Sequence, residues 1–153
     1  MTVPPLADFA VVPRLMGIWH SEFIALDGDA RETRRFHSTI TQKIEGGRWV
    51  QSNENIYADG SSDTWRFFGD PISPTEVRLE SPDAPYDGFR MLVREVADNI
   101  VLLQVWDIAS GAVLATETFT LVDAGTRVRT IQQFSPPDGA LRGFMAVKER
   151  RVA

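Results

Sequence analysis

Hydrophobic and polar positions alternate along most of the chain, and short turn signals interrupt this alternation at regular intervals. Segments rich in Val, Ile, Thr, Phe, Trp and Tyr are separated by pairs such as Asp27-Gly28, Gly46-Gly47 and Asp59-Gly60. These pairs tolerate positive φ angles and close hairpins, and a period of two residues is typical of strands with one buried face. The pattern therefore predicts an all-β protein built from hairpins.

About ten strands are expected from this pattern, at residues 17–26, 31–44, 48–58, 62–69, 75–81, 88–96, 99–108, 112–122, 126–135 and 140–151. Two proline-bearing connections, 71–74 and 81–85, flank the short fifth strand and predict looser loops at a rim. Residues 6–16 can hold a short helix, which Pro13 breaks or restarts.

The short connections favour a closed structure. A flat meander of this length would leave two exposed edges, and a Greek-key sandwich would need some long crossovers. The sequence thus predicts one domain over residues 1–153, an antiparallel up-and-down β-barrel of about ten strands with a short N-terminal helical segment. A barrel of this strand number is wide enough to enclose a small molecule.

Alternation divides each strand into two faces, and the more apolar face is assigned to the interior. On the second strand this places Arg34 and Phe36 inside and His37 outside. The other residues expected to line the cavity on this basis are Trp65, Phe67, Met91, Gln104, Trp106, Glu117, Phe119, Gln132 and Met145. An aromatic and Met-rich lining with a few polar groups is typical of a small-molecule site.

The third strand is unusual because neither of its faces is plainly apolar. Asn53, Asn55 and Tyr57 share a face with Trp49. A cavity with polar handles explains this pattern, and a solvated outer face explains it equally well. We include Asn53, Asn55 and Tyr57 among the expected site residues.

The segment Gly17-Ile18-Trp19 begins the first strand directly after the short helical segment. Gly-x-Trp in this position resembles the calycin superfamily of lipocalin-like barrels. The stretches "LMGIWHSEF" and "NENIYADGSSDTWRF" resemble, more narrowly, a bacterial lipocalin-like domain related to the phycobilin lyases. The resemblance implies that Trp19 closes the barrel bottom beneath Arg150 or Arg151. With Trp19 inside, alternation turns His20 outward.

Composition excludes several functions. The 16 Lys and Arg against 21 Asp and Glu leave no cationic surplus for nucleic acid. Without cysteine there is no disulfide, thiolate metal site or cysteine nucleophile. The two histidines both precede residue 40, whereas haem-binding barrels of this type use a histidine near the C-terminal strands. No metal or cofactor is therefore expected.

No apolar run approaches the ~18 residues of a membrane span, and the N-terminal residues lack the pattern of a signal peptide. We therefore expect a cytoplasmic protein, and leave open a homodimer. The expected partner is a small apolar molecule held in the barrel.

Two functions follow from such a barrel. One is a cofactor-independent cyclase or isomerase of a polyketide-, polyene- or terpenoid-like intermediate in bacterial metabolism, with Glu117, Tyr57 and Arg34 as the catalytic candidates. The other is a non-catalytic carrier, or a bilin lyase that passes an open-chain tetrapyrrole to a cysteine of its partner. The missing export signal shifts the balance toward the enzyme. A purely structural module remains a third alternative.

Overall fold

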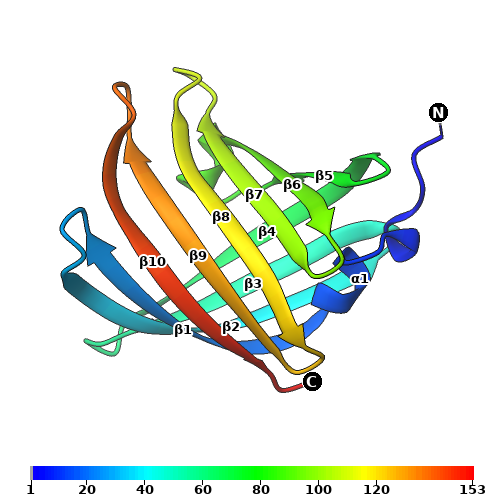
Figure 1. Ribbon diagram of the computed structural model, residues 1–153, viewed down its shortest axis with the longest axis horizontal. Coiled ribbons are helices and arrows are strands. Elements are labelled where there is room, and N and C mark those ends of the chain that lie inside the picture. The colour runs from blue at the N-terminus through cyan, green and yellow to red at the C-terminus, as the bar shows by residue number, and fades with distance from the viewer. Residues whose placement is uncertain (1) are drawn as a thin grey trace.

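Ten antiparallel strands form one closed barrel in the computed structural model, which describes residues 2–153. Each strand pairs with its neighbours in sequence, and β10 closes the ring against β1 (Figure 1). The strands are β1 (Gly17–Asp27), β2 (Glu32–Glu45), β3 (Arg48–Tyr57), β4 (Ser62–Ser73), β5 (Glu76–Glu80), β6 (Phe89–Ala97), β7 (Ile100–Asp107), β8 (Val113–Asp123), β9 (Thr126–Ser135) and β10 (Ala140–Arg151). The predicted all-β, up-and-down barrel is confirmed.

The N-terminal segment covers one end of the barrel. It contains a short 3-10 helix, η1 (Leu6–Asp8), and one turn of α-helix, α1 (Val12–Leu15), with Pro13 in its first turn. The carboxylate of Glu95 accepts hydrogen bonds from the backbone N–H groups at the start of this turn, which have no partner within the helix. The segment buries five apolar side chains against the barrel, those of Leu6, Phe9, Val11, Val12 and Leu15.

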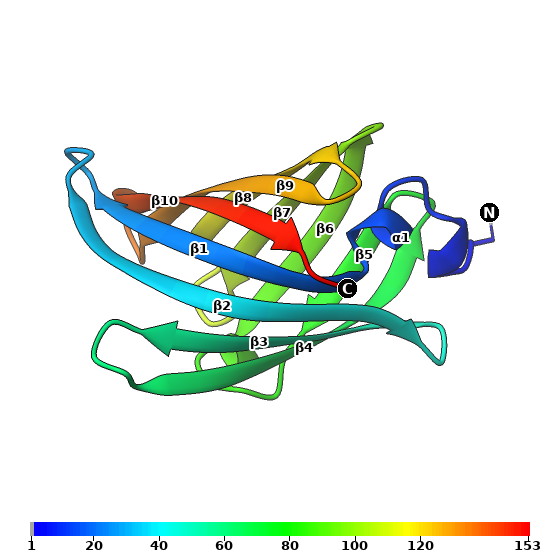
Figure 2. The same cartoon turned by 90° about the horizontal axis from the view of Figure 1, so that it is seen from below.

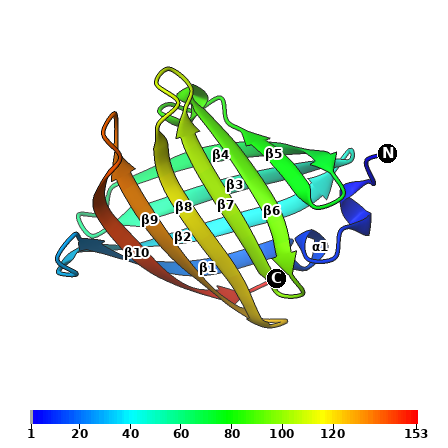
Figure 3. The same cartoon turned by 45° about the horizontal axis from the view of Figure 1, so that its top comes forward.

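The two ends of the barrel differ because successive strands run in opposite directions. The hairpins β1–β2, β3–β4, β7–β8 and β9–β10 and the β5–β6 loop therefore lie at one end. The remaining turns lie at the other end, together with α1, as Figures 2 and 3 show. The β5–β6 loop holds a second 3-10 helix, η2 (Tyr86–Gly88).

Trp19 forms the floor at the covered end. It is fully buried, and its indole Nε1–H donates to the carbonyl of Leu15 at 2.8 Å. The guanidinium groups of Arg127 and Arg151 lie 4.1 and 4.4 Å from its ring centroid. Arg151 therefore takes the position that the resemblance implied for Arg150 or Arg151. Arg127 was not expected there.

A buried carboxylate joins two arginines just above this floor. Glu149 Oε2 lies 2.7 Å from Arg127 Nη2, and Glu149 Oε1 lies 2.6 Å from Arg129 Nε. The hydroxyl of Ser21 also donates to Glu149, at 3.0 Å. Burial alone raises the pKa of Glu149, but Arg129 and Arg127 outweigh it and hold this pKa below its usual range. Glu149 is therefore ionised inside the barrel.

One expected loop is wrong. Residues 71–74 were assigned to a loose connection, but β4 continues to Ser73 and Pro71 pairs with Val77. The register shifts between Pro71 and Ser73. The residue left outside the ladder is Ile72, and Pro71, which lacks an N–H donor, is tolerated next to such a bulge. The second proline-bearing connection does form an irregular loop.

Replacing Glu149 by Gln should destabilise the fold, because Arg127 and Arg129 would stay buried without their shared carboxylate. We expect Glu149→Gln to lower the free energy of unfolding by about 3 kcal/mol, measured by urea denaturation at pH 7. The matched control is Glu32→Gln, which removes an exposed partner of Arg35 and should leave stability nearly unchanged. Equal losses in the two variants would contradict the role of the buried network.

Candidate functional site

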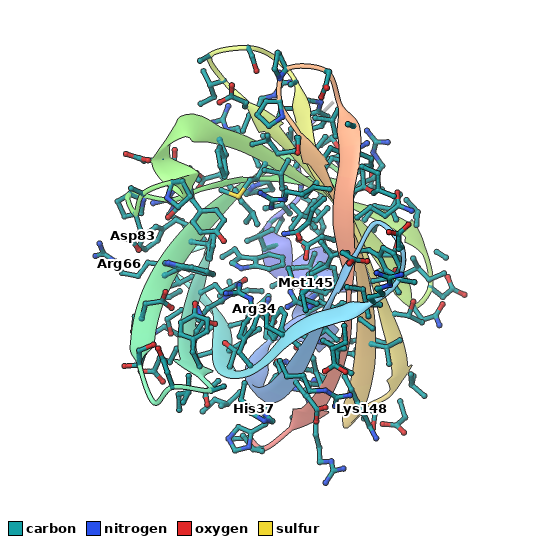
Figure 4. The ribbon with its side chains drawn as sticks, turned by 90° about the vertical axis from the view of Figure 1, so that its left-hand side faces the viewer. Arg34, His37, Arg66, Asp83, Met145 and Lys148 are labelled. Atoms are coloured by element: carbon teal, nitrogen blue, oxygen red, sulfur yellow. The ribbon has the colours of Figure 1, made fainter. Side chains whose placement is uncertain are left out.

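The barrel encloses a cavity of about 530 Å³. Its lining extends from Leu15 near the floor to Tyr86 and Pro136 in loops at the opposite end, so the cavity opens between those loops. Figure 4 looks into this end and shows Arg34 and Met145 within the ring of strands. The volume falls in the range of small-molecule sites.

An aromatic stack extends from the cavity wall on β1 and β2 to β3. The rings of Phe23 and Phe36 are stacked with their centroids 4.5 Å apart, and Tyr57 follows Phe36 at 5.3 Å. The guanidinium of Arg34 lies 5.0 Å from the centroid of Phe36. Arg34 therefore faces the cavity as expected, with its charge against an aromatic surface.

Tyr86 is the centre of a second aromatic group. Its ring lies 5.0 Å from both Trp65 and Phe67 and 5.6 Å from Phe89. Burial raises the pKa of the Tyr86 hydroxyl, and the negative charge of Glu117 raises it further. The phenol is therefore neutral at physiological pH and keeps its proton available as a hydrogen-bond donor.

Glu117 introduces a titratable carboxyl into a mostly apolar wall. It lies on β8 between Ala115 and Phe119, which also line the cavity, and only 13% of its side chain is exposed. Desolvation by burial raises its pKa; Arg129, 3.9 Å away, opposes this effect, and Glu149 adds to it. A carboxyl of this kind can exchange a proton nearer neutral pH than an exposed glutamate.

Amide side chains form a hydrogen-bonded row on the inner face of β3. The Gln51 oxygen accepts from Trp49 Nε1 at 3.0 Å, and Gln51 Nε2 donates to Asn53 Oδ1 at 2.8 Å. This arrangement resolves the ambiguity of the third strand, because Asn53 and Asn55 are buried and line the cavity.

Tyr57 lies at the outer end of the same strand and, unlike Asn53 and Asn55, is not among the residues that line the cavity. Its hydroxyl donates to the carboxylate of Asp63, with Oη 2.9 Å from Oδ2, and Asn55 Nδ2 donates to the same carboxylate. Burial and the Asp63 charge raise the pKa of Tyr57. Tyr57 is thus a weaker acid than usual, and its proton is already committed to Asp63.

The structure brings most of the expected residues together. Beside Arg34 and Glu117, the cavity is lined by Phe36, Asn53, Asn55, Trp65, Phe67, Met91, Phe119 and Met145. Their roles in binding or catalysis stay predictions. Both histidines lie in a shallow groove on the outer surface, as their strand positions predict, and His37 lies outside the ring in Figure 4.

Three expected lining residues, Gln104, Trp106 and Gln132, are instead on the outer face, and their placement inside was wrong. On β7 both faces are largely apolar, and the buried face consists of Val101, Leu103 and Val105. Trp106 packs beneath the guanidinium of Arg90 at 4.6 Å. Because apolar content hardly differs between the two faces, this criterion assigned the wrong face of β7 to the interior.

On β9 the inner face carries Arg127 and Arg129, followed by Ile131 and Gln133. Two charged residues on one face of a strand indicate a solvated surface unless their partners are known. The pattern therefore placed Gln132 inside. The usable signal was the charge of Glu149 and Glu117 on the neighbouring strands, which pair with these arginines.

Tyr86 was also missed, because it lies in a loop where no periodicity applies. Within residues 2–153, no group of three or more His, Cys, Asp or Glu side chains is arranged to hold a metal ion. In the same part of the chain, no helix has the length and apolar character needed to span a membrane.

Comparison with known proteins places the fold. No protein-family model matches the chain, and no curated protein matches it. A protein of unknown function from the DUF3598 family of Nostoc punctiforme is similar in structure, with a TM-score of 0.69 and 19% identity over 92% of this chain and 48% of that one. The chain therefore spans about half the length of that protein.

Two further solved structures are similar. Rv2717c from M. tuberculosis gives a TM-score of 0.66 at 14% identity over the whole of both chains. The S-type phycobiliprotein lyase CPES from Guillardia theta gives 0.68 at 12% identity, over 92% of this chain and 90% of that one. The predicted barrel fold, similar to that of a phycobiliprotein lyase, is confirmed. At these identities the likeness concerns the fold alone.

The raised pKa of Glu117 should appear in the pH dependence of stability. A carboxyl whose pKa is raised in the folded state stabilises the fold below its ordinary pKa of 4.5, and this contribution is lost as the pH rises through the raised value. We therefore expect Glu117→Gln to be more stable than the parent at pH 8, with a smaller difference at pH 5. Urea midpoints at the two pH values measure this, and a difference that shrinks toward pH 8 would contradict it.

Proposed function

We propose that the barrel binds a small, largely apolar molecule and catalyses a proton transfer on it without a cofactor. The reaction class is that of an isomerase or cyclase acting on a polyene-, polyketide- or terpenoid-like substrate. The observation that carries the proposal is the carboxyl of Glu117, which has a raised pKa within a mostly apolar cavity wall. Acid–base groups tuned in this way are typical of catalytic sites.

Burial of the substrate would supply most of the binding free energy. Aromatic side chains dominate two walls of the cavity, and each 100 Å² of apolar surface removed from water contributes about 2.5 kcal/mol. The floor at Trp19 and α1 limits access of water from the covered end. Such an enclosure favours a folded conformer of the substrate and shields reactive intermediates.

Glu117 would then move a proton between two carbons of the substrate. Its carboxylate removes a proton from one carbon, the electron pair of the broken C–H bond delocalises into the substrate π-system, and the carboxylic acid returns the proton to a second carbon. Atoms and electrons balance in this cycle without any oxidant or reductant. Near neutral pH, the free energies of the charged and neutral forms are closer for a carboxyl with a raised pKa than for an exposed glutamate. Such a carboxyl therefore suits both the removal and the return of the proton.

Deuterium incorporation tests the proton transfer even while the substrate is unidentified. We expect a ligand that copurifies with the protein to gain deuterium at carbon when the complex is incubated in D2O, as measured by mass spectrometry. Glu117→Gln should retain the ligand and lose this exchange by at least about 100-fold. Equal exchange in the variant would overturn the catalytic role of Glu117, whereas Tyr57→Phe, whose hydroxyl is bound to Asp63, should change exchange much less.

Bilin carriage is the second candidate, and the likeness to a phycobiliprotein lyase supports it. Within residues 2–153, no carboxylate oxygen lies within 4.0 Å of the guanidinium groups of Arg34 or Arg142, which both line the cavity. A bilin carries propionate groups that match such cations.

On this alternative, biliverdin added to the protein binds and its visible absorption band shifts. Arg34→Gln should then raise the dissociation constant of biliverdin about tenfold, because a charge-assisted hydrogen bond is lost. Absorption titration measures both effects. An unchanged spectrum at micromolar biliverdin would exclude the bilin alternative and leave the isomerase proposal intact.

A further inference from the structure

A chain of hydrogen bonds on the cavity wall has a fixed direction, because it begins at a group that can only donate. Arg127 Nη1 donates to the Gln42 side-chain oxygen at 2.7 Å. A guanidinium has no acceptor atom, so the Gln42 oxygen must face Arg127 and the Gln42 amino group must face away. That amino group donates to Gln51 Oε1 at 2.9 Å.

Two donors, the Gln42 amino group and Trp49 Nε1, fix the orientation of the Gln51 amide. Trp49 Nε1, which is also a donor only, reaches the same Gln51 oxygen at 3.0 Å. The Gln51 amino group therefore faces Asn53 and donates to Asn53 Oδ1 at 2.8 Å. The orientation of the Asn53 amide follows: its oxygen is occupied, and its Nδ2 amino group is the free end of the chain.

Asn53 Nδ2 ends in the cavity. Asn53 is 8% exposed and lines the cavity, and within residues 2–153 its amino group donates to no side chain or backbone carbonyl. The Asn53 amino group is not among the fully buried polar atoms that lack a partner, so part of it is exposed to the cavity. A ligand in the cavity can therefore place an acceptor oxygen against it.

Two further donors lie beside Asn53. Trp65 is the partner of Asn53 across the β3–β4 ladder, and the ring of Tyr86 lies 5.0 Å from that of Trp65. In the described part of the chain, neither the Trp65 indole N–H nor the Tyr86 hydroxyl forms a hydrogen bond. These neutral donors suit a neutral acceptor oxygen, whereas the cations Arg34 and Arg142, which suit a carboxylate, line the cavity from β2 and β10.

The acid of the proposed reaction lies across the cavity from this wall. In the closed order of ten strands, β3 and β8 are separated by the same number of strands in both directions. Asn53 on β3 and Glu117 on β8 therefore belong to opposite walls of the barrel, and both line the same cavity.

We infer that the ligand is a carbonyl compound, a ketone, aldehyde or enone, whose oxygen accepts a hydrogen bond from Asn53 Nδ2. Asn53 thereby determines specificity and orients the carbons next to the carbonyl toward Glu117. This inference rests on the proposed function, since it assigns a substrate class to the same cavity. The carbonyl inference differs from the proposed function because it requires a directed hydrogen bond to the ligand in addition to apolar enclosure.

A matched pair of probes separates the two claims. The probes 2-acetylnaphthalene and 2-ethylnaphthalene have nearly the same shape, and only the first has a carbonyl oxygen. We expect Asn53→Leu to raise the dissociation constant of the ketone about tenfold relative to that of the hydrocarbon, measured by tryptophan fluorescence titration. The control Gln132→Leu replaces an exposed amide outside the cavity and should leave both constants unchanged.

A second variant tests the direction of the chain with Asn53 intact. Gln51→Glu keeps an oxygen for Trp49 Nε1 but cannot donate to Asn53, so the Asn53 amide should reverse and turn its oxygen to the cavity. Ketone affinity should then fall as in Asn53→Leu, with hydrocarbon affinity retained. In the infrared, the carbonyl stretch of the bound ketone should lie at lower frequency in the parent than in either variant.

The outcomes distinguish the two claims. If the parent binds both probes and the substitutions change the two affinities equally, or change neither, the carbonyl inference is overturned and apolar enclosure stands. If the folded parent, checked by circular dichroism, binds neither probe, the proposed enclosure fails and the carbonyl inference fails with it.

Discussion

Arg127 and Arg129 stand inside the barrel, where an isolated charge would be too costly to bury, and Glu149 lies within 2.7 Å of both. Much of the interior is organised around this ion cluster. Arg127 packs on Trp19 and so completes the floor, and it also directs the amide of Gln42. The Glu149 carboxylate therefore supports both the closed end of the barrel and the polar wall of the cavity above it.

The same cluster sets the electrostatics at Glu117. Arg129 packs against the rings of Phe23 and Phe119 and approaches Glu117 to 3.9 Å. That distance is too long for a hydrogen bond, and the positive charge of Arg129 is already shared with Glu149. Desolvation consequently outweighs attraction, and the pKa of Glu117 rises. If Glu149 were absent, Arg129 would stabilise the Glu117 carboxylate more strongly and lower its pKa.

The sequence predicted the number and order of strands because their signals are local. Turn pairs such as Asp27-Gly28 and Asp59-Gly60 mark hairpin ends directly. Which face of a strand is buried is not always determined by residues nearby in the sequence. On β2 the buried face carries Phe36 and Ile40 and was assigned correctly. On β9 the buried face carries Arg127 and Arg129, whose partner Glu149 lies on another strand. Charges that are neutralised by tertiary pairing cannot be recognised from the alternation of a single strand.

The third strand shows how an apparent irregularity in sequence can be a consequence of a hydrogen-bonded network. Its inner positions are amides because a chain of donors and acceptors runs along the wall from Arg127. A purely structural core would gain stability from apolar residues at these positions, since amides only break even when every donor finds an acceptor. Here the chain is satisfied at each link until Asn53 Nδ2, which faces the cavity. A network whose last donor meets an enclosed space is the arrangement that the proposed carbonyl ligand requires.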